Sequence, residues 1–243
     1  MKKLMILAIA FSLSLLLSWN PLLMSNLQAQ SEPFYKGKTI RIIVGSTTGG
    51  FYDRWARLFS RYMGKYIPGN PEIIAQNMPA AGSLVATNYV YNVAKPDGLT
   101  LGMPLSSIYL EQLAARKEVQ FDLRNFHWIG SPAREATILY MRADAPYTSM
   151  ADIIKATELP KCGSTGTASQ SYTFLKMLED TLGAKFNNVV GYQGGSEVDL
   201  AVEKGEVICR AHNISAHFGR EPFNTWHRKG FDRHIIQGSR KRD

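Results

Sequence analysis

The sequence predicts an α/β fold of two domains, each a mainly parallel sheet flanked by helices. The chain has 243 residues, of which 45% are hydrophobic, and this is enough to bury a sizeable core. Strand-like and helix-like segments alternate almost without a break, which is typical of parallel sheets. A short strand, a loop of Gly, Ser and Thr, and a helix follow one another at residues 39–62 and again at 161–182. This repeated unit indicates two domains that each present a helix N-terminus to a shared cleft.

Residues 1–29 have the pattern of an export signal. Lys2 and Lys3 precede an uncharged apolar run over residues 4–19, and the small residue Ala29 follows a polar stretch. We therefore predict a secretory signal peptide that is cleaved after Ala29. The alternative is an uncleaved membrane anchor, because the apolar run approaches the minimum length of a membrane span. With a signal peptide, the chain is expected to be exported.

The first domain, residues 30–131, is expected to open with the β-branched strand TIRIIVG. Apolar residues recur at helical spacing after it, which predicts a helix with one aromatic face on a sheet: Trp55, Leu58, Phe59, Tyr62 and Tyr66. The segments expected next are a strand, a helix, a strand and a helix: 72–77, 84–94, 99–105 and 107–116. Residues 121–147 read as two strands on either side of a loop.

The second domain, residues 132–230, repeats the same order of elements. Ser149 is available as the N-cap of a short helix in SMADIIKA. A longer helix follows the second Gly-Ser-Thr loop, with apolar residues on one side: Tyr172, Leu175, Leu178 and Leu182. Cys162 and Cys209 both lie in strand-like segments of this domain. A disulfide and two buried free thiols fit this pattern equally well, because the required geometry does not follow from sequence.

The two matched loops, GSTTGG at 45–50 and GSTGTAS at 163–169, predict an anion site. A helix N-terminus offers free backbone N–H groups and the positive end of the helix dipole, and glycines allow a ligand to approach closely. Phe51 stands where a nucleotide phosphate loop needs its lysine, so a carboxylate or a small oxyanion is the expected guest. The alternative is that the loops only cap their helices. Hydroxyl groups that could add neutral donors are Ser46, Thr47, Thr48, Ser164, Thr165, Thr167 and Ser169.

Asp53 falls in the first turn of the first helix, where the dipole favours a carboxylate, and its spacing predicts an ion pair with Arg57 four residues further on. Two roles are open for Asp53. It either caps the helix or contacts an amino or hydroxyl group of the ligand.

Several motifs occur in a fixed order along the chain. Gly49-Gly50 precedes Asp53 and Ala56-Arg57, and later motifs are QNMPAAGS at 76–83, KPDG at 95–98, CGSTGTASQSYTFLKMLEDTLG at 162–183 and VVGYQGGSEVDLAVEKGEV at 189–207. With these motifs the chain resembles the tripartite tricarboxylate transporter solute receptors, also called Bug proteins, over essentially its whole length after the leader. The resemblance implies a two-lobed periplasmic binding protein fold of the type II kind. It also implies capture of a di- or tricarboxylate or a related organic acid, and delivery of that acid to the membrane permease subunits of a transporter.

The resemblance also implies the ligand contacts, with backbone amides making most of them. Those expected from the first lobe are Ser46, Thr47, Thr48, Gly49, Gly50, Phe51, Ala81 and Gly82, together with Asp53. Those expected from the second lobe are Ser164, Thr165, Gly166, Thr167, Ala168, Ser169, Tyr192 and Gly194. Two departures from the family are visible. Ser46, Thr47 and Thr48 replace an apolar residue and a proline, and residues 231–243 are expected to be an incomplete strand that returns to the first lobe, leaving the C-terminal part truncated.

Other classes of function are disfavoured. The formal net charge of +8 comes from dispersed residues except near the C-terminus, so a solvated basic face is expected and no nucleic acid. No GxSxG or HExxH motif is present, and the spacings of the histidines place no pair on one helix face, so we expect neither an enzyme nor a metal site. An extracytoplasmic sensor or adaptor using the same pocket is the main alternative, and an enzyme acting on a small organic acid is the lesser one. We expect a monomer without a cofactor.

Overall fold

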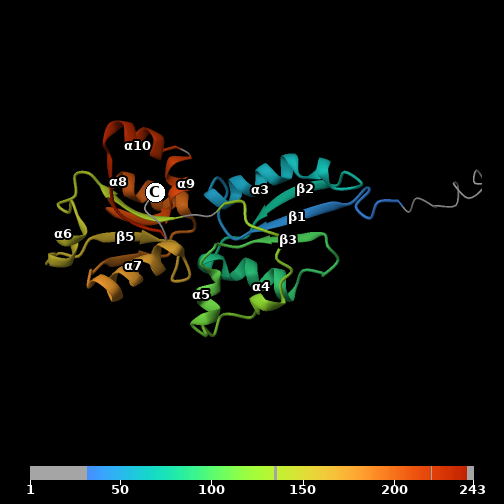
Figure 1. The fold of residues 1–243 in the computed structure, drawn as a ribbon, viewed down its shortest axis with the longest axis horizontal. Coiled ribbons are helices and arrows are strands. Elements are labelled where there is room, and N and C mark those ends of the chain that lie inside the picture. The colour runs from blue at the N-terminus through green and yellow to red at the C-terminus, as the bar shows by residue number, and fades with distance from the viewer. Residues whose placement is uncertain (1–31, 134–135, 220, 240–243) are drawn as a thin grey trace, which may run out of the picture.

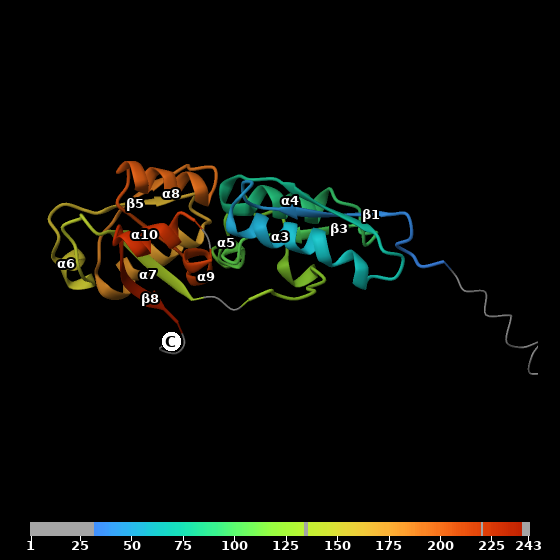
Figure 2. The ribbon, with the colours of Figure 1, turned by 90° about the horizontal axis from the view of Figure 1, so that it is seen from above.

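The computed structural model describes residues 32–133, 136–219 and 221–239, which form two α/β lobes lying side by side (Figure 1). A view from above shows the same separation into lobes (Figure 2). The leader predicted at residues 1–29 lies outside the described residues. Within them, no helix combines the length and the apolar character that crossing a membrane requires.

The first lobe is built on a three-stranded parallel sheet in the order β2-β1-β3. Its strands are β1 (Thr39–Val44), β2 (Glu72–Asn77) and β3 (Thr100–Met103). The central strand β1 is the most apolar of the three, and Ile40, Ile42, Ile43 and Val44 are each at most 2% exposed. β-Branched residues suit such a strand, because it is covered on both faces.

Helices cover both faces of this sheet, with α3 on one side and α4 on the other (Figure 1). The helical elements of the lobe are α3 (Phe51–Tyr62), α4 (Leu84–Asn92) and α5 (Ile108–Leu113), with single 3-10 turns at Gly64–Tyr66, Ala81–Ser83 and Leu123–Asn125. The loops that follow β1 and β2 both lead into helices at the edge nearest the second lobe. This edge is where the carboxyl ends of parallel strands place a ligand site.

The buried face of α3 differs from the predicted one. The face that packs on the sheet consists of Tyr52, Ala56, Phe59 and Met63. Leu58, Tyr62 and Tyr66 are exposed, at 44%, 47% and 76%, so their assignment to the core was wrong. A small alanine lets the helix approach the sheet closely, and the larger tyrosines then lie at the solvent side with their hydroxyl groups in water.

The segment between the lobes contains one of the two strands predicted for residues 121–147. That strand is β4 (Thr137–Arg142), and the described residues 121–133 contain no strand. Phe126 packs against Phe121 and Tyr91, and Trp128 Nε1 donates to the Leu123 carbonyl oxygen at 2.9 Å. These aromatic residues therefore pack together in a local cluster under the loop and do not form a strand.

The second lobe contains a five-stranded sheet in the order β6-β5-β7-β4-β8. Its strands are β4, β5 (Lys161–Ser164), β6 (Asn187–Val190), β7 (Cys209–Asn213) and β8 (Asp232–Gly238). β5 pairs in parallel with β6 and β7, whereas β4 runs antiparallel to both β7 and β8. Four of the five strands thus run in one direction, and β4 is reversed.

Helices flank this second sheet on both faces. They are α6 (Met150–Lys155), α7 (Gln170–Leu182), α8 (Gly195–Lys204), α9 (Ile214–Phe218) and α10 (Phe223–Lys229). One core lies between the sheet and α7, around Leu139, Leu175 and Leu178. The other lies under α8 and α10, around Tyr140, Val202 and Trp226. Ser149 caps α6 as predicted: its side chain accepts from the backbone N–H of Asp152, in a complete capping box.

As far as residue 239, where the described part of the chain ends, the C-terminal segment does not return to the first lobe. The prediction for residues 231–243 was a strand of the first sheet, but β8 pairs along β4 at the edge of the second sheet, from Arg142↔Asp232 to Thr137↔Gly238. The long β4 has one free edge after pairing with β7, and β8 satisfies the backbone groups of that edge.

Cys162 and Cys209 form a disulfide between the neighbouring strands β5 and β7. The sequence left their pairing open. The two residues lie directly opposite each other in the sheet, and both are fully buried in the core on the α7 side.

Candidate functional site

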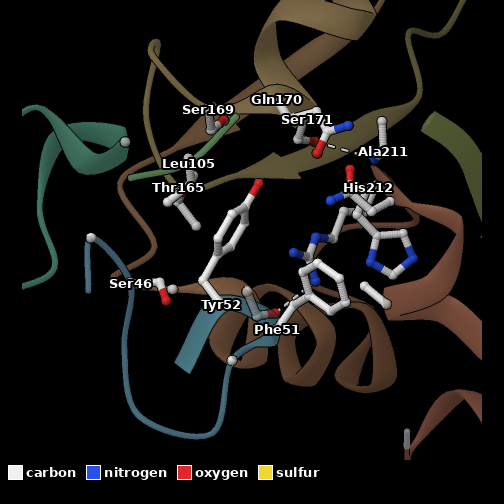
Figure 3. Close-up of a pocket in the computed structure, with 18 of the residues that line it drawn as sticks. Ser46, Phe51, Tyr52, Leu105, Thr165, Ser169, Gln170, Ser171, Ala211 and His212 are labelled. Atoms are coloured by element: carbon white, nitrogen blue, oxygen red, sulfur yellow. Dashed lines mark hydrogen bonds between the residues drawn. The ribbon is translucent and has the colours of Figure 1, made fainter. Parts of the chain in front are cut away.

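A cavity of about 80 Å³ lies between the two lobes (Figure 3). The first lobe contributes residues from the loops after its three strands, and the second lobe contributes the starts of two helices and the end of β7. The lining residues are Gly45, Ser46, Gly50, Phe51, Tyr52, Ala80, Gly82, Leu105, Thr165, Ser169, Gln170, Ser171, Gln193, Gly194, Gly195, Arg210, Ala211, His212, Asn213 and Ala216.

Three helix N-termini meet at this cavity. The N-cap residues of α3, α7 and α8 are Gly50, Ser169 and Gly194, and all three line it. The Ser169 side chain accepts a hydrogen bond from the N–H of Tyr172, but Gly50 and Gly194 provide no side-chain cap. The first amides of α3 and α8 therefore lack the usual capping partner, and the positive ends of three helix dipoles act on one small volume.

Asp53 fixes the shape of the loop before α3. It is 1% exposed and accepts hydrogen bonds from the Gly49 N–H, Arg57 Nε and Asn77 Nδ2, at 2.8, 2.8 and 2.9 Å. Asn77 Nδ2 also donates to the Ser46 carbonyl oxygen at 2.9 Å. Gly49 has φ +80°, a left-handed conformation that suits glycine.

The charge of Asp53 is stabilised by the same contacts. Burial alone would raise the pKa of this carboxyl, but Arg57, the Gly49 N–H and Asn77 together hold its pKa below the ordinary value. The predicted ion pair with Arg57 is confirmed, and the Asp53 side chain is directed at the loop and away from the cavity lining. Its position thus corresponds to the capping alternative.

Several predicted hydroxyl groups make other bonds. Thr48 Oγ1 donates to Asn77 Oδ1 at 3.1 Å, and Ser164 Oγ donates to Asn188 Oδ1 at 2.7 Å. Thr167 Oγ1 accepts from Arg116 of the first lobe. Thus these three side chains hold loops in place and do not line the cavity.

The structure divides the predicted site residues into two groups. Those that line the cavity are Ser46, Gly50, Phe51, Gly82, Thr165, Ser169 and Gly194. Those placed around it are Thr47, Thr48, Gly49, Asp53, Ala81, Ser164, Gly166, Thr167, Ala168 and Tyr192. Phe51 projects from the start of α3 toward the side of the cavity where His212 lies (Figure 3).

Contacts between the lobes account for some residues of the second group, among them Thr47, Thr167 and Ala168. Ser107 Oγ donates to the Ala168 carbonyl oxygen at 2.7 Å, and Thr47 Oγ1 donates to Glu197 Oε2 at 3.4 Å. Ala168 packs in a hydrophobic cluster of the first lobe, and a Cβ atom on Gly82 would come within 2.6 Å of the Ala168 Cβ. Hence part of the second Gly-Ser-Thr loop joins the lobes together instead of facing the cavity.

Residues at the end of β7 are the main part of the lining that the sequence analysis missed. Arg210, Ala211, His212 and Asn213 all line the cavity. The rule that ligands gather at the carboxyl ends of parallel strands could have found them, because the chain turns directly from β7 into α9. Ser171 Oγ accepts from the Ala211 N–H at 3.2 Å and so joins this strand to α7 (Figure 3).

Arg210 brings a guanidinium group to the cavity, but its charge is balanced within the lobe. It forms an ion pair with the buried Asp199, and its Nη1 donates to the Gly195 carbonyl oxygen at 2.8 Å. Burial alone would lower the pKa of Arg210, but Asp199 raises it above the ordinary value. The lining therefore carries little uncompensated charge from this pair.

Two α/β lobes around a cavity at their helix N-termini define the class of periplasmic binding proteins. The family model described as "Tripartite tricarboxylate transporter family receptor" (TctC) matches residues 57–219, and the chain belongs to this family. The family is one of solute-binding receptors, as the resemblance in the sequence predicted. No curated protein matches the chain significantly.

Solved structures share the fold. The periplasmic binding protein BugD is 18% identical with a TM-score of 0.72, over 86% of this chain and 68% of that one. MatC from Rhodopseudomonas palustris, solved with bound malate, is 21% identical with a TM-score of 0.73, over 85% and 69%. Another R. palustris protein, solved with adipate, is 19% identical with a TM-score of 0.72, over 85% and 67%.

Proposed function

We propose that this protein is an extracytoplasmic receptor that captures a small carboxylate between its lobes without changing it chemically. A di- or tricarboxylate or a related organic acid is the expected ligand. The observation that carries the proposal is the meeting of three helix N-termini at one cavity between the lobes. The malate and adipate bound by two proteins of the same fold support the choice of ligand class.

The chemistry of the lining favours an anion recognised by neutral donors. Free amides at the starts of α3 and α8 can donate to carboxylate oxygens without requiring a counter-ion to be buried. Thr165 and Ser46 add hydroxyl groups, and Phe51 and Leu105 supply apolar surface for a carbon chain.

Ligand binding is tested by titration calorimetry and thermal-shift screening of a library of mono-, di- and tricarboxylates. We expect at least one di- or tricarboxylate to bind with a single site per chain and to raise the melting temperature. Mass analysis of the recovered ligand should return the acid unchanged. Turnover of the acid would move the protein to the enzyme class, and binding of amines or neutral sugars alone would contradict the anion site.

We further propose that the protein acts as a monomer in the periplasm and delivers its ligand to the membrane permease subunits of a tripartite tricarboxylate transporter. Membership of the receptor family supports this role. Uptake of the identified acid by cells with and without the gene, together with pull-down of permease subunits by the loaded receptor, tests it. Uptake that is independent of the gene would favour the sensor or adaptor alternative.

A further inference from the structure

Behind the wall of the cavity, three side chains from two elements bring their metal-binding atoms to one point. His217 comes from α9, and Asp232 and His234 come from the same face of β8. His217 Nε2 lies 2.7 Å from Asp232 Oδ2 and 2.8 Å from His234 Nε2, and His234 Nε2 lies 3.5 Å from Asp232 Oδ2. The histidine spacing in the sequence gave no sign of this, because a rule for one helix face does not apply to residues on different elements.

Hydrogen bonds alone do not account for this cluster. His217 Nε2 can carry one proton, and that proton can point straight at either Asp232 or His234 but not at both. Both carboxylate oxygens of Asp232 are buried and accept no well-aligned hydrogen bond from the described residues, although His217 is so near. The ion-pair partners beside this buried carboxylate are His217 and His234, and an imidazole balances its charge only when the ring is protonated.

A divalent metal ion would satisfy all three atoms at once. A triangle with sides of 2.7, 2.8 and 3.5 Å has its centre roughly 1.8 Å from each corner, and zinc bonds to histidine and carboxylate are about 2.0–2.2 Å long. An ion slightly above the plane of the three atoms would therefore reach each of them. Two imidazoles and a carboxylate, with a fourth position left open, are a common ligand set for zinc and related metals.

His212 orients the ring of His217 for this arrangement. Its Nε2 lies 3.0 Å from His217 Nδ1, so the second ring nitrogen of His217 is held by a neighbour while Nε2 faces the cluster. Metal-binding histidines are normally oriented in this way by a partner on the other nitrogen. The side chain of His234 is 33% exposed, which gives an ion a path from solvent.

We propose that His217, Asp232 and His234 bind one divalent transition-metal ion, represented here by Zn²⁺. The ion would join β8 to α9 next to the cavity wall, because His212 lies between the cluster and the cavity. Its role would be to hold the edge of the second lobe together, and metal binding would then add to the stability of the folded protein.

The test is a Zn²⁺ titration of the full chain after treatment with a chelator. We expect one equivalent to bind and to raise the melting temperature. His234→Gln and Asp232→Asn should each weaken Zn²⁺ binding at least tenfold. His127→Gln, at an exposed histidine of the first lobe, is the matched control and should bind Zn²⁺ like the wild type.

A second probe is Co²⁺, whose visible absorption reports the coordination geometry. The wild type and His127→Gln should show the bands of a four-coordinate site, and His234→Gln should not. Circular dichroism identifies a variant that fails to fold, and His234 is the safer position because it is partly exposed. The proposal is overturned if the wild type takes up no stoichiometric Zn²⁺, or if folded His234→Gln binds it as tightly as the wild type.

Discussion

Replacement of Gly194 by alanine should weaken ligand binding by keeping the lobes apart. Gly194 has φ −163° and ψ 178°, an extended conformation that any residue adopts, so alanine brings no backbone strain. Its Cβ atom, however, would lie 1.8 Å from Thr47 Oγ1 and 2.8 Å from Thr47 Cβ. These two residues belong to different lobes, and the second lobe must therefore move away from the first.

The size of the effect follows from the cost of inserting one methyl group where there is no space. Overpacking of this kind typically costs about 1–3 kcal/mol. If the clash exists only when the lobes are together, that cost appears as a loss of affinity of roughly 5- to 140-fold. The free energy of unfolding should change less, because the lobes can relieve the clash by separating.

Titration calorimetry with the acid identified by screening measures the affinity, and solution scattering measures the separation of the lobes. Gly130→Ala is the matched control, because no heavy atom lies within 4 Å of its new Cβ. Alanine at 194 could also block the cavity directly, so Thr47→Gly is added in a double variant. Recovery of affinity in that variant assigns the effect to the clash. Wild-type affinity in Gly194→Ala, or a double variant as weak as the single one, would refute the reasoning.

Three further outcomes are expected. Thr165→Ala should weaken ligand binding by about 1 kcal/mol in calorimetry, whereas Thr167→Ala, outside the lining, should change it much less; equal losses would contradict the assignment. Asp53→Asn should lower the free energy of unfolding by about 2 kcal/mol at pH 7. Because the folded-state pKa of Asp53 is depressed, this difference should persist down to about pH 4 and shrink below it in urea unfolding at several pH values, and a difference independent of pH would argue against a charged Asp53. Replacing Cys162 and Cys209 together by alanine should cost about 2–4 kcal/mol in urea unfolding, and an unchanged midpoint would show that the disulfide contributes little.

The order of strands and helices could be predicted because it depends on local patterns. The β-branched run of β1 and the Ser149 capping box are both signals within a few residues of sequence, and both are present in the structure. The buried face of α3 was harder to predict, because the spacing of aromatic residues does not reveal which side of the helix approaches the sheet. Ala56, a small residue, marks the buried side, and hydrophobicity alone gives it little weight.

Pairings between distant segments could not be predicted from such patterns. β8 joins β4 across about ninety residues of sequence, and nothing near Asp232 distinguishes this partner from the first sheet. The same holds for the cluster at His217, which depends on that pairing to bring β8 beside α9. Both features become visible only when the sheet is assembled.

Residues of the candidate site could be predicted where they lie at the start of a helix. They could not be predicted where packing between the lobes decides which way a loop faces. Gly50, Ser169 and Gly194 follow from loops that lead into helices, and each lines the cavity. Thr167 and Ala168 carry the same loop composition, yet they face the first lobe, because the loop turns as it enters α7. Composition identifies such a loop but does not say which of its residues point inward.

The disulfide between β5 and β7 also bears on how the receptor can adapt to a new ligand. Thr165 follows Cys162 by three residues, and Ala211 follows Cys209 by two, so the covalent link lies directly behind two parts of the cavity lining. Sliding of one strand against the other would break this link. The spacing between Thr165 and Ala211 in the wall of the second lobe is therefore fixed. Changes of specificity during evolution would then arise most readily in the first lobe, where Ser46 lies on a loop without a covalent cross-link and Phe51 begins the helix that follows it.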